Sequence, residues 1–304
     1  MKTIQHLLVI AFLSIFVSCK KEPKETNLDA TIISELSYGS DSKQKMDVYL
    51  PENRGSSTPV IVFIHGGGFV AGDKNEFSAQ MKSLSAQGFA VLNVNYRLVD
   101  LDGVLTSPIV HKPSTVKIAD QLNDVQAAIN FAAGKAGEWN ISADKWGITG
   151  HSAGGTLSLL YAYGDKNTGK RIKVAGNWAG ATTFAFSDES EFKLLDPRLV
   201  EVIYRAVGAE PVNASKLAYM AVSPYWIANQ SKAIATINIR PEDNNVATLP
   251  DGSKILYQQF TDVLTSKGVP NKWVEVAGAD HGFSKAGNWD QVINETSLFF
   301  KSKL

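Results

Sequence analysis

Cysteine is almost absent from this sequence, and neither sign of charge is in excess. The 304 residues include one cysteine, so no disulfide can form within the chain and no cysteine cluster can bind a metal. Thirty Lys and Arg residues balance thirty Asp and Glu residues. With no basic stripe or acidic tail, this balance argues against nucleic acid or another polyanion as a partner. No HExxH motif is present either, and we expect no metal.

The single cysteine lies where a lipid anchor would be attached. Lys2 precedes an apolar run, residues 7–17, that is too short to span a membrane, and Cys19 follows it closely. This pattern resembles a bacterial lipoprotein signal. It predicts a signal peptide over 1–18, a lipid anchor on Cys19 and a flexible tether over 19–30. We therefore expect the protein on the bacterial cell envelope, at the periplasmic or outer-membrane face. The alternatives are a plain secretory signal, which would give a secreted protein, and an N-terminal anchor.

Strand-like and helix-like segments alternate after residue 30. Apolar residues make up 44% of the chain and charged residues 20%, an ordinary globular mixture. The pattern predicts an α/β fold with a mostly parallel sheet, antiparallel leading strands and helices on both faces. We expect one domain over 31–304, with a cap-like insertion over 182–232 where the alternation stops. The expected strands span residues 31–38, 46–50, 60–64, 89–94, 146–149, 174–179, 233–239 and 272–276.

A glycine-bracketed serine stands between one of these strands and a helix. Residues 150–154, Gly-His-Ser-Ala-Gly, match the pattern G-x-S-x-G of a nucleophile elbow. A strand that turns sharply into a helix strains the serine backbone, and glycines two positions away leave room for the turn. The serine hydroxyl is then held at a helix N-terminus, which favours developing negative charge. The pattern therefore indicates Ser152 as a nucleophile.

A glycine loop, residues 65–69 with the sequence His-Gly-Gly-Gly-Phe, directly follows a buried strand. Consecutive glycines allow backbone N–H groups to approach a substrate closely, because no Cβ intervenes. Acyl transfer needs such donors, aimed at the carbonyl oxygen as it becomes an oxyanion. The loop does not match the usual phosphate-binding glycine motifs, so it favours an oxyanion site over a phosphate site.

A nucleophilic serine also needs a general base, and the chain has five histidines. His281 follows the 272–276 strand and precedes a glycine, as a base at the sheet edge should. The other four are less suitable, because one lies in the signal peptide, one in the glycine loop, one in a loop between other elements and one beside the serine. In open α/β sheets the site lies beyond the carboxyl ends of the strands, which again favours His281.

The acid that orients this histidine should follow the 233–239 strand. That strand is followed by Arg-Pro-Glu-Asp-Asn-Asn, and Asp243 is the choice that fits best. Glu242 and Asp251 are the alternatives. The resulting chain order of serine, aspartate and histidine is the order found with a nucleophile elbow.

Together these motifs resemble the α/β-hydrolase superfamily, and within it the HGGG-type esterases and lipases, particularly carbohydrate-esterase and feruloyl-esterase-like members. The resemblance covers about residues 31–304 and rests on the motifs at 65–69, 95–98, 150–155, 243–246 and 280–283. It implies that Ser152 is the nucleophile, His281 the base and Asp243 the acid. It also implies that the oxyanion hole is formed by the amides of Gly67, Gly68 and Ala153. In the family a His-Gly or similar pair usually precedes the aspartate, whereas Arg-Pro-Glu stands here.

The expected function is a serine carboxylic-ester hydrolase that works through an acyl-enzyme without a cofactor. The resemblance implies acetyl or feruloyl-type groups on glycans or small esters as substrates. A peptidase or amidase of the same fold, and an inactive binding protein, are the alternatives. The sequence does not indicate an oligomeric state. Six aromatic residues lie in or near segments that should rim the site. They could stack on a sugar or hold an aromatic acyl group, but each one taken singly is expected to pack the insertion onto the domain. They are Phe69, Trp178, Phe184, Phe186, Tyr225 and Trp226.

Overall fold

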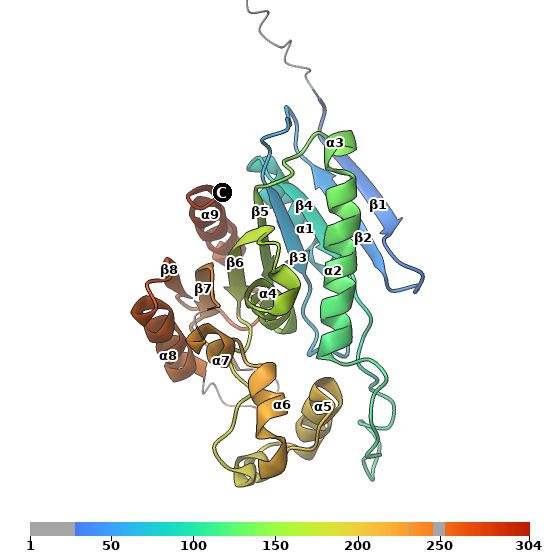
Figure 1. Cartoon of the computed structure of the whole chain (residues 1–304), viewed down its shortest axis with the longest axis vertical. Helices are drawn as coiled ribbons and strands as arrows, with labels where there is room; N and C mark the ends of the chain where they lie inside the picture. The colour runs from blue at the N-terminus through green and yellow to red at the C-terminus, as the bar shows by residue number, and fades with distance from the viewer. Residues whose placement is uncertain (1–27, 231, 246–252) are drawn as a thin grey trace, which may run out of the picture.

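The computed structural model describes residues 28–230, 232–245 and 253–304. In this part of the chain eight strands form one sheet in the order β1-β2-β4-β3-β5-β6-β7-β8 (Figure 1). β2 is antiparallel to both of its neighbours, and the remaining neighbours pair in parallel. This confirms the predicted mostly parallel sheet with antiparallel leading strands. The strands are β1 Thr31–Ser37, β2 Lys45–Leu50, β3 Val60–Ile64, β4 Ala90–Val94, β5 Trp146–Gly150, β6 Ile172–Trp178, β7 Ala235–Pro241 and β8 Asn271–Val276.

The carboxyl ends of the parallel strands meet at one edge of the sheet because their registers match. Ile64, the last residue of β3, pairs with Val94 of β4 on one side and with Gly150 of β5 on the other. The glycine loop and the nucleophile elbow therefore leave the sheet next to each other. Pro241 of β7 pairs with Val276 of β8, so the loops that carry the candidate acid and base leave the same edge.

Helices cover both faces of the sheet, as the sequence predicts (Figure 1). α1 and α9 pack together on one face, and α2, α4 and α8 cover the other. The central strands β3, β4 and β5 are therefore buried throughout, which explains their continuous apolar runs. The helices are α1 Ser78–Ala86, α2 Ile118–Gly134, α3 Ala136–Trp139, α4 Ala153–Tyr163, α8 Ser253–Ser266 and α9 Asn288–Lys301, with short 3₁₀ helices at η1 Lys74–Phe77 and η2 Asp165–Asn167.

The segment between β6 and β7 leaves the sheet and forms a group of short helices beyond its carboxyl edge, at the bottom of Figure 1. We call this group the cap. Its elements are η3 Glu189–Leu194, α5 Pro197–Val207, η4 Asn213–Ser215, α6 Lys216–Ala221 and α7 Pro224–Asn229.

A fully buried arginine joins the cap to the loop after β4. Arg205 of α5 donates hydrogen bonds to the backbone oxygens of Asp100, Asp102 and Val110, at 2.9, 2.9 and 2.6 Å. It also donates to a carboxylate oxygen of Glu201, at 2.7 Å. A buried arginine is stable only when its donors and charge are satisfied, and these contacts satisfy both. Arg205 therefore fixes the cap against the body of the protein.

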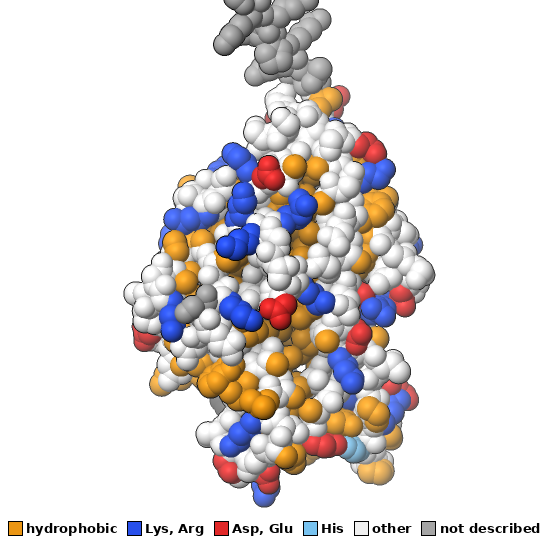
Figure 2. Space-filling model, in the orientation of Figure 1, with side chains coloured by type: hydrophobic (Ala, Val, Ile, Leu, Met, Phe, Trp, Pro, Cys, Tyr) orange, Lys and Arg blue, Asp and Glu red, His pale blue; other side chains and the backbone are white. Residues whose placement is uncertain are grey.

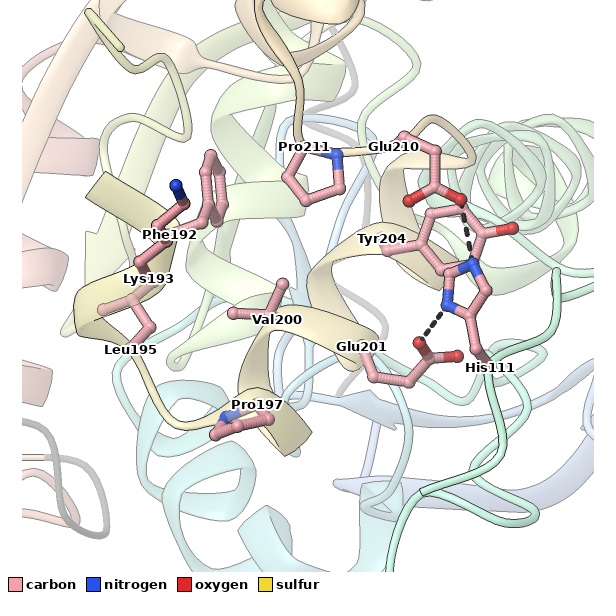
Figure 3. Close-up of a pocket in the computed structure, with 10 residues that line it drawn as sticks. All are labelled: His111, Phe192, Lys193, Leu195, Pro197, Val200, Glu201, Tyr204, Glu210 and Pro211. Carbon is pink, nitrogen blue, oxygen red and sulfur yellow. Dashed lines mark hydrogen bonds and ion pairs between the residues drawn. The ribbon is translucent and has the colours of Figure 1, made fainter. Parts of the chain in front are cut away.

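A histidine clamp adds to this junction (Figure 3). His111 Nδ1 lies 2.7 Å from Glu201, its Nε2 lies 2.9 Å from Glu210, and its ring stacks on Tyr204 with centroids 4.6 Å apart. The hydrogen bond with Glu201, and after it the bond with Glu210, raises the pKa of His111, although partial burial opposes the shift. The clamp therefore favours the charged imidazolium, and it links the loop after β4 to two segments of the cap.

The described chain begins at the edge of the sheet opposite to these loops. Thr31, the first residue of β1, pairs with Leu50 at the end of β2. β1 runs in the same direction as the parallel strands, so Thr31 lies at their amino edge, at the top of Figure 1. Among the described residues, none of the helices has both the length and the apolar content that a membrane span requires.

We expect Arg205→Ala to destabilise the protein by about 3 kcal/mol, because it leaves the buried Glu201 carboxylate without its main partner. The measurement is the free energy of unfolding in urea, followed by circular dichroism. Arg198→Ala, at an exposed position of the same helix, is the matched control and should change stability by less than about 0.5 kcal/mol. Equal effects of the two substitutions would contradict the role given to Arg205.

Candidate active site

Ser152 lies on a sharp turn between β5 and α4 and has a strained backbone. Its φ is 53° and its ψ is −123°, a combination that residues other than glycine rarely adopt. Glycines make the turn possible: a Cβ on Gly150 would lie 2.4 Å from the Gly154 oxygen, and a Cβ on Gly154 would lie 2.0 Å from the Ile64 oxygen. The serine is thereby held at the N-terminus of α4, which begins at Ala153.

The imidazole of His281 reaches this serine from the loop after β8. His281 Nε2 lies 3.0 Å from Ser152 Oγ, within the range expected for a nucleophile and its general base. The histidine is partly buried, and burial lowers its pKa, while the Asp280 carboxylate acts in the opposite direction. A lowered pKa keeps the imidazole neutral at neutral pH, as a base must be. The structure therefore brings together the two residues that the sequence placed at the centre of the site.

The third position differs from the prediction, because the residue that contacts His281 Nδ1 is Asn244. Its side-chain oxygen lies 2.6 Å from Nδ1. Asp243 instead has an exposed side chain whose oxygen accepts a hydrogen bond from the amide of Asn245 at 3.1 Å. The choice of Asp243 as the residue against the imidazole is therefore wrong in this geometry.

The two alternatives do not fill the position either. A carboxylate oxygen of Glu242 accepts a hydrogen bond from the amide of Gly278 at 2.6 Å, which ties together the loops after β7 and β8. Asp251 lies outside the described residues. The strand is longer than its apolar run: the run ends at Ile239, but β7 pairs with β8 as far as Pro241, so the loop begins at Glu242.

The glycine loop lies directly beside the elbow. A Cβ on Gly66 would lie 3.1 Å from Ser152 Cβ, so the two segments touch. Gly67 and Gly68 have φ values of 112° and 60° and are exposed. In the described part of the chain no hydrogen bond is donated by the amides of Gly67, Gly68 or Ala153. These groups are thus available to a ligand next to Ser152, as an oxyanion hole requires.

Two buried histidines support this edge of the sheet. His65 stacks on Tyr96, with ring centroids 4.4 Å apart, and the Tyr96 hydroxyl donates to the His65 oxygen at 2.9 Å. His151 places its Nε2 2.8 Å from the backbone oxygen of His281 and so fixes the loop that carries the base. The sequence did not reveal this role of His151, because its only signal was its position next to the serine.

The aromatic residues near the site differ in their surroundings. Trp178 is fully buried, and its Nε1 donates to Thr296 Oγ1 at 2.9 Å, so it supports the sheet and does not line the site. Phe69 of the glycine loop contacts Phe184 at the start of the cap segment, with ring centroids 5.9 Å apart. Trp226 of α7 is 36% exposed. The cap therefore reaches the glycine loop through aromatic contacts.

A cavity of about 310 Å³ lies within the cap, beside the histidine clamp (Figure 3). Its lining contains neither Ser152 nor His281, so it is separate from the serine–histidine pair. Among the described side chains, no group of three or more His, Cys, Asp and Glu residues could hold a metal ion. The lining residues are His111, Phe192, Lys193, Leu195, Pro197, Val200, Glu201, Tyr204, Glu210 and Pro211.

Comparison with known proteins agrees with this geometry. The BD-FAE family model matches residues 46–248. An acetylxylan esterase of Xylanibacter ruminicola is 33% identical over 126 residues, which is 41% of this chain and 23% of that enzyme. The chain spans 22% and 23% of the length of two curated relatives that it matches.

Solved structures share the fold. A truncated form of a carbohydrate esterase from gut microbiota has a TM-score of 0.67 and 21% identity, over 92% of this chain and 98% of that one. Esterase B from Lactobacillus rhamnosis has a TM-score of 0.68 and 17% identity, over 90% of this chain and 86% of that one. The chain thus has the α/β-hydrolase fold.

We expect the protein to lose stability as the pH falls from 7.5 to 5.5. Burial lowers the pKa of His65 and of His151 to about 4, whereas an unfolded histidine titrates near pH 6.5. Between these values the unfolded chain binds protons that the folded protein does not. Each histidine therefore contributes a stability that is complete above about pH 6.5 and decreases towards pH 4. The full decrease is about 3 kcal/mol for each histidine.

The measurement is the free energy of unfolding in urea at pH 7.5, 6.5 and 5.5, a range in which carboxylates with lowered pKa values stay ionised. His65→Gln removes one of the two histidines whose pKa burial lowers to about 4, and it should give a shallower dependence on pH than the unchanged protein. An identical slope in both proteins would show that the buried His65 does not contribute.

Proposed function

The chain belongs to the BD-FAE family, and from this premise we propose that it is a serine carboxylic-ester hydrolase acting through an acyl-enzyme. One observation carries the proposal: the 3.0 Å contact between Ser152 Oγ and His281 Nε2, beside amides of the glycine loop and α4 that donate to no group in the described chain. This is the arrangement that attack on a carbonyl carbon requires.

In the first half of the reaction Ser152 Oγ attacks the ester carbonyl carbon while His281 Nε2 takes the hydroxyl proton. The carbonyl electron pair moves onto oxygen, and the amides of Gly67, Gly68 and Ala153 hold the oxyanion. Collapse of this intermediate breaks the carbon–oxygen bond to the alcohol, which leaves with the proton from Nε2. One oxyanion donor contributes about 2.7–4 kcal/mol in such sites.

In the second half water replaces the alcohol. His281 Nε2 removes a proton from the water as its oxygen attacks the acyl carbon, and the same amides hold the second oxyanion. Its collapse breaks the bond to Ser152 Oγ, and Nε2 returns the proton to the serine. Every proton is therefore carried by one imidazole, and the reaction needs no metal and no organic cofactor.

For the substrate we propose acetyl or feruloyl-type esters of glycans or small alcohols. Two similar proteins carry the names acetylxylan esterase and carbohydrate esterase, which supports a sugar as the alcohol. The contact of Phe69 with Phe184 brings aromatic rings from the cap to the glycine loop, and such rings pack well against sugar or aromatic acyl groups.

We expect Ser152→Ala to lower kcat/KM for p-nitrophenyl acetate by at least about a thousandfold while the protein stays folded, because the nucleophile is lost. The control is Ser83→Ala, at an exposed position of α1, which should keep full activity. A fluorophosphonate probe should label the unchanged protein and not Ser152→Ala. Undiminished hydrolysis by Ser152→Ala would overturn the proposal.

A substrate panel separates the ester hydrolase from its rivals. Acetylated xylan, methyl ferulate and short p-nitrophenyl esters should be cleaved, and matched p-nitroanilides should not. Preferential cleavage of the anilides would identify a peptidase or amidase. Absence of both turnover and probe labelling would indicate a binding protein with the same fold.

We also propose that the chain is a lipoprotein of the bacterial cell envelope, anchored through a lipid on Cys19 after removal of residues 1–18. The support is in the sequence: the chain's only cysteine follows a short apolar run and precedes a polar stretch. Cys19 lies outside the described residues.

Cys19→Ala should abolish incorporation of radiolabelled palmitate and release the protein from the membrane fraction, because the tethering lipid can no longer be attached. The unchanged protein, expressed in the same bacterium, is the reference. Equal release of both proteins into the medium would favour the plain secretory signal.

A further inference from the structure

We propose that Asn244 is the third member of the catalytic relay, and that it orients His281 without supplying a negative charge. This inference rests on the proposed serine ester hydrolase. It concerns a position where a carboxylate was expected from the sequence and where the structure has an amide 2.6 Å from His281 Nδ1.

The hydrogen bonds of the imidazole fix how it is protonated. An amide oxygen can only accept, so Nδ1 must carry the proton that it donates to Asn244 Oδ1. In a neutral ring Nε2 then has a free lone pair, and this nitrogen faces the hydroxyl of Ser152 at 3.0 Å. Asn244 thus selects the tautomer in which the imidazole can accept the serine proton.

The two carboxylates that precede Asn244 in the loop are engaged elsewhere. Asp243 donates its amide to the Ala279 oxygen at 3.0 Å, and its exposed side chain accepts from the amide of Asn245. Glu242 accepts from the amide of Gly278 at 2.6 Å. These contacts set the register of the loop, and this register brings residue 244 to the imidazole.

Among the described residues, two other titratable groups near His281 have side chains that are engaged elsewhere or neutral. Asp280 is next in the chain and raises the pKa of His281, but its carboxylate is bound to the amide of Ser284 at 2.8 Å. His151, whose ring centroid is 5.1 Å from that of His281, is neutral because burial lowers its pKa to about 4. Burial is the larger influence on His281 and lowers its pKa.

Two consequences follow for catalysis. The base stays unprotonated to a lower pH than it would beside a carboxylate, so activity should persist into mildly acidic solution. The imidazolium that forms when Ser152 loses its proton gains no opposing charge from residue 244, so the transition state is less stabilised. Compared with a carboxylate in the same position, Asn244 therefore gives a lower reaction rate but keeps the enzyme active at lower pH.

Asn244→Asp tests both consequences, because it keeps the shape of the side chain and adds the charge. We expect the acidic limb of kcat/KM for p-nitrophenyl acetate to move up by about one pH unit, and the plateau rate to rise roughly tenfold. Asn244→Ala should lower the plateau by about a hundredfold, because the tautomer is no longer selected.

Asp290→Asn, at an exposed position of α9, is the control and should leave both the plateau and the acidic limb unchanged. Asp243→Asn tests the rival position directly. If Asp243→Asn instead lowers the plateau while Asn244→Ala does not, Asp243 is the third member and the inference is wrong. Unchanged profiles in both Asn244 variants also overturn it. If Ser152→Ala loses activity, the proposed ester hydrolase function still stands even when the inference about Asn244 fails. The two proposals can therefore be distinguished.

A titration that does not depend on turnover removes the remaining ambiguity. ¹⁵N-histidine NMR of the full chain should show His281 protonated at Nδ1, and Asn244→Asp should raise its pKa by about one unit. His281→Gln identifies the resonance. An unchanged pKa in Asn244→Asp would contradict the inference, whether or not that variant is active.

Discussion

The site depends on backbone packed against backbone, where the elbow meets the end of β3. The Cα of Gly154 is so close to the carbonyl oxygen of Ile64 that a Cβ would come within 2.0 Å. A Cβ on Gly66 would lie 3.1 Å from Ser152 Cβ, so the glycine loop also touches the elbow. These contacts hold the serine in its strained conformation, and they set the glycine loop beside it. His151 extends the same packing to the loop of the base through its bond to the His281 oxygen. Because no flexible side chain separates the segments, the position of the nucleophile is fixed before any substrate arrives.

The sequence predicts those parts of the site whose conformation is determined by residues close by in the chain. The elbow and the glycine loop can be recognised because their sterics require glycine at fixed spacing, and the mostly parallel sheet follows from buried runs that alternate with helices. Asn244 could not be recognised, because the end of β7 is decided by its pairing with β8, and that partner lies more than thirty residues away. The sequence leaves the surroundings of Trp178 open for a similar reason, since it is the last residue of β6 and turns into the core.

An amide in the third position separates two tasks that a carboxylate performs together. Orientation of the imidazole needs only an acceptor at the correct distance, and Asn244 provides one. Attack also creates an imidazolium and an oxyanion, and electrostatic groups nearby must stabilise them. The N-terminus of α4 and the amides of the glycine loop are placed to stabilise the oxyanion. The balance of the site thus shifts from the base towards the oxyanion hole.

The described chain starts at the amino edge of the sheet, whereas Ser152 lies at the carboxyl edge. For a protein held through Cys19 by a flexible tether, as proposed, this polarity would place the attachment point and the catalytic end at opposite edges of the sheet. Several copies anchored in the same membrane could then act side by side on a polymer that is too large or too rigid to approach the bilayer.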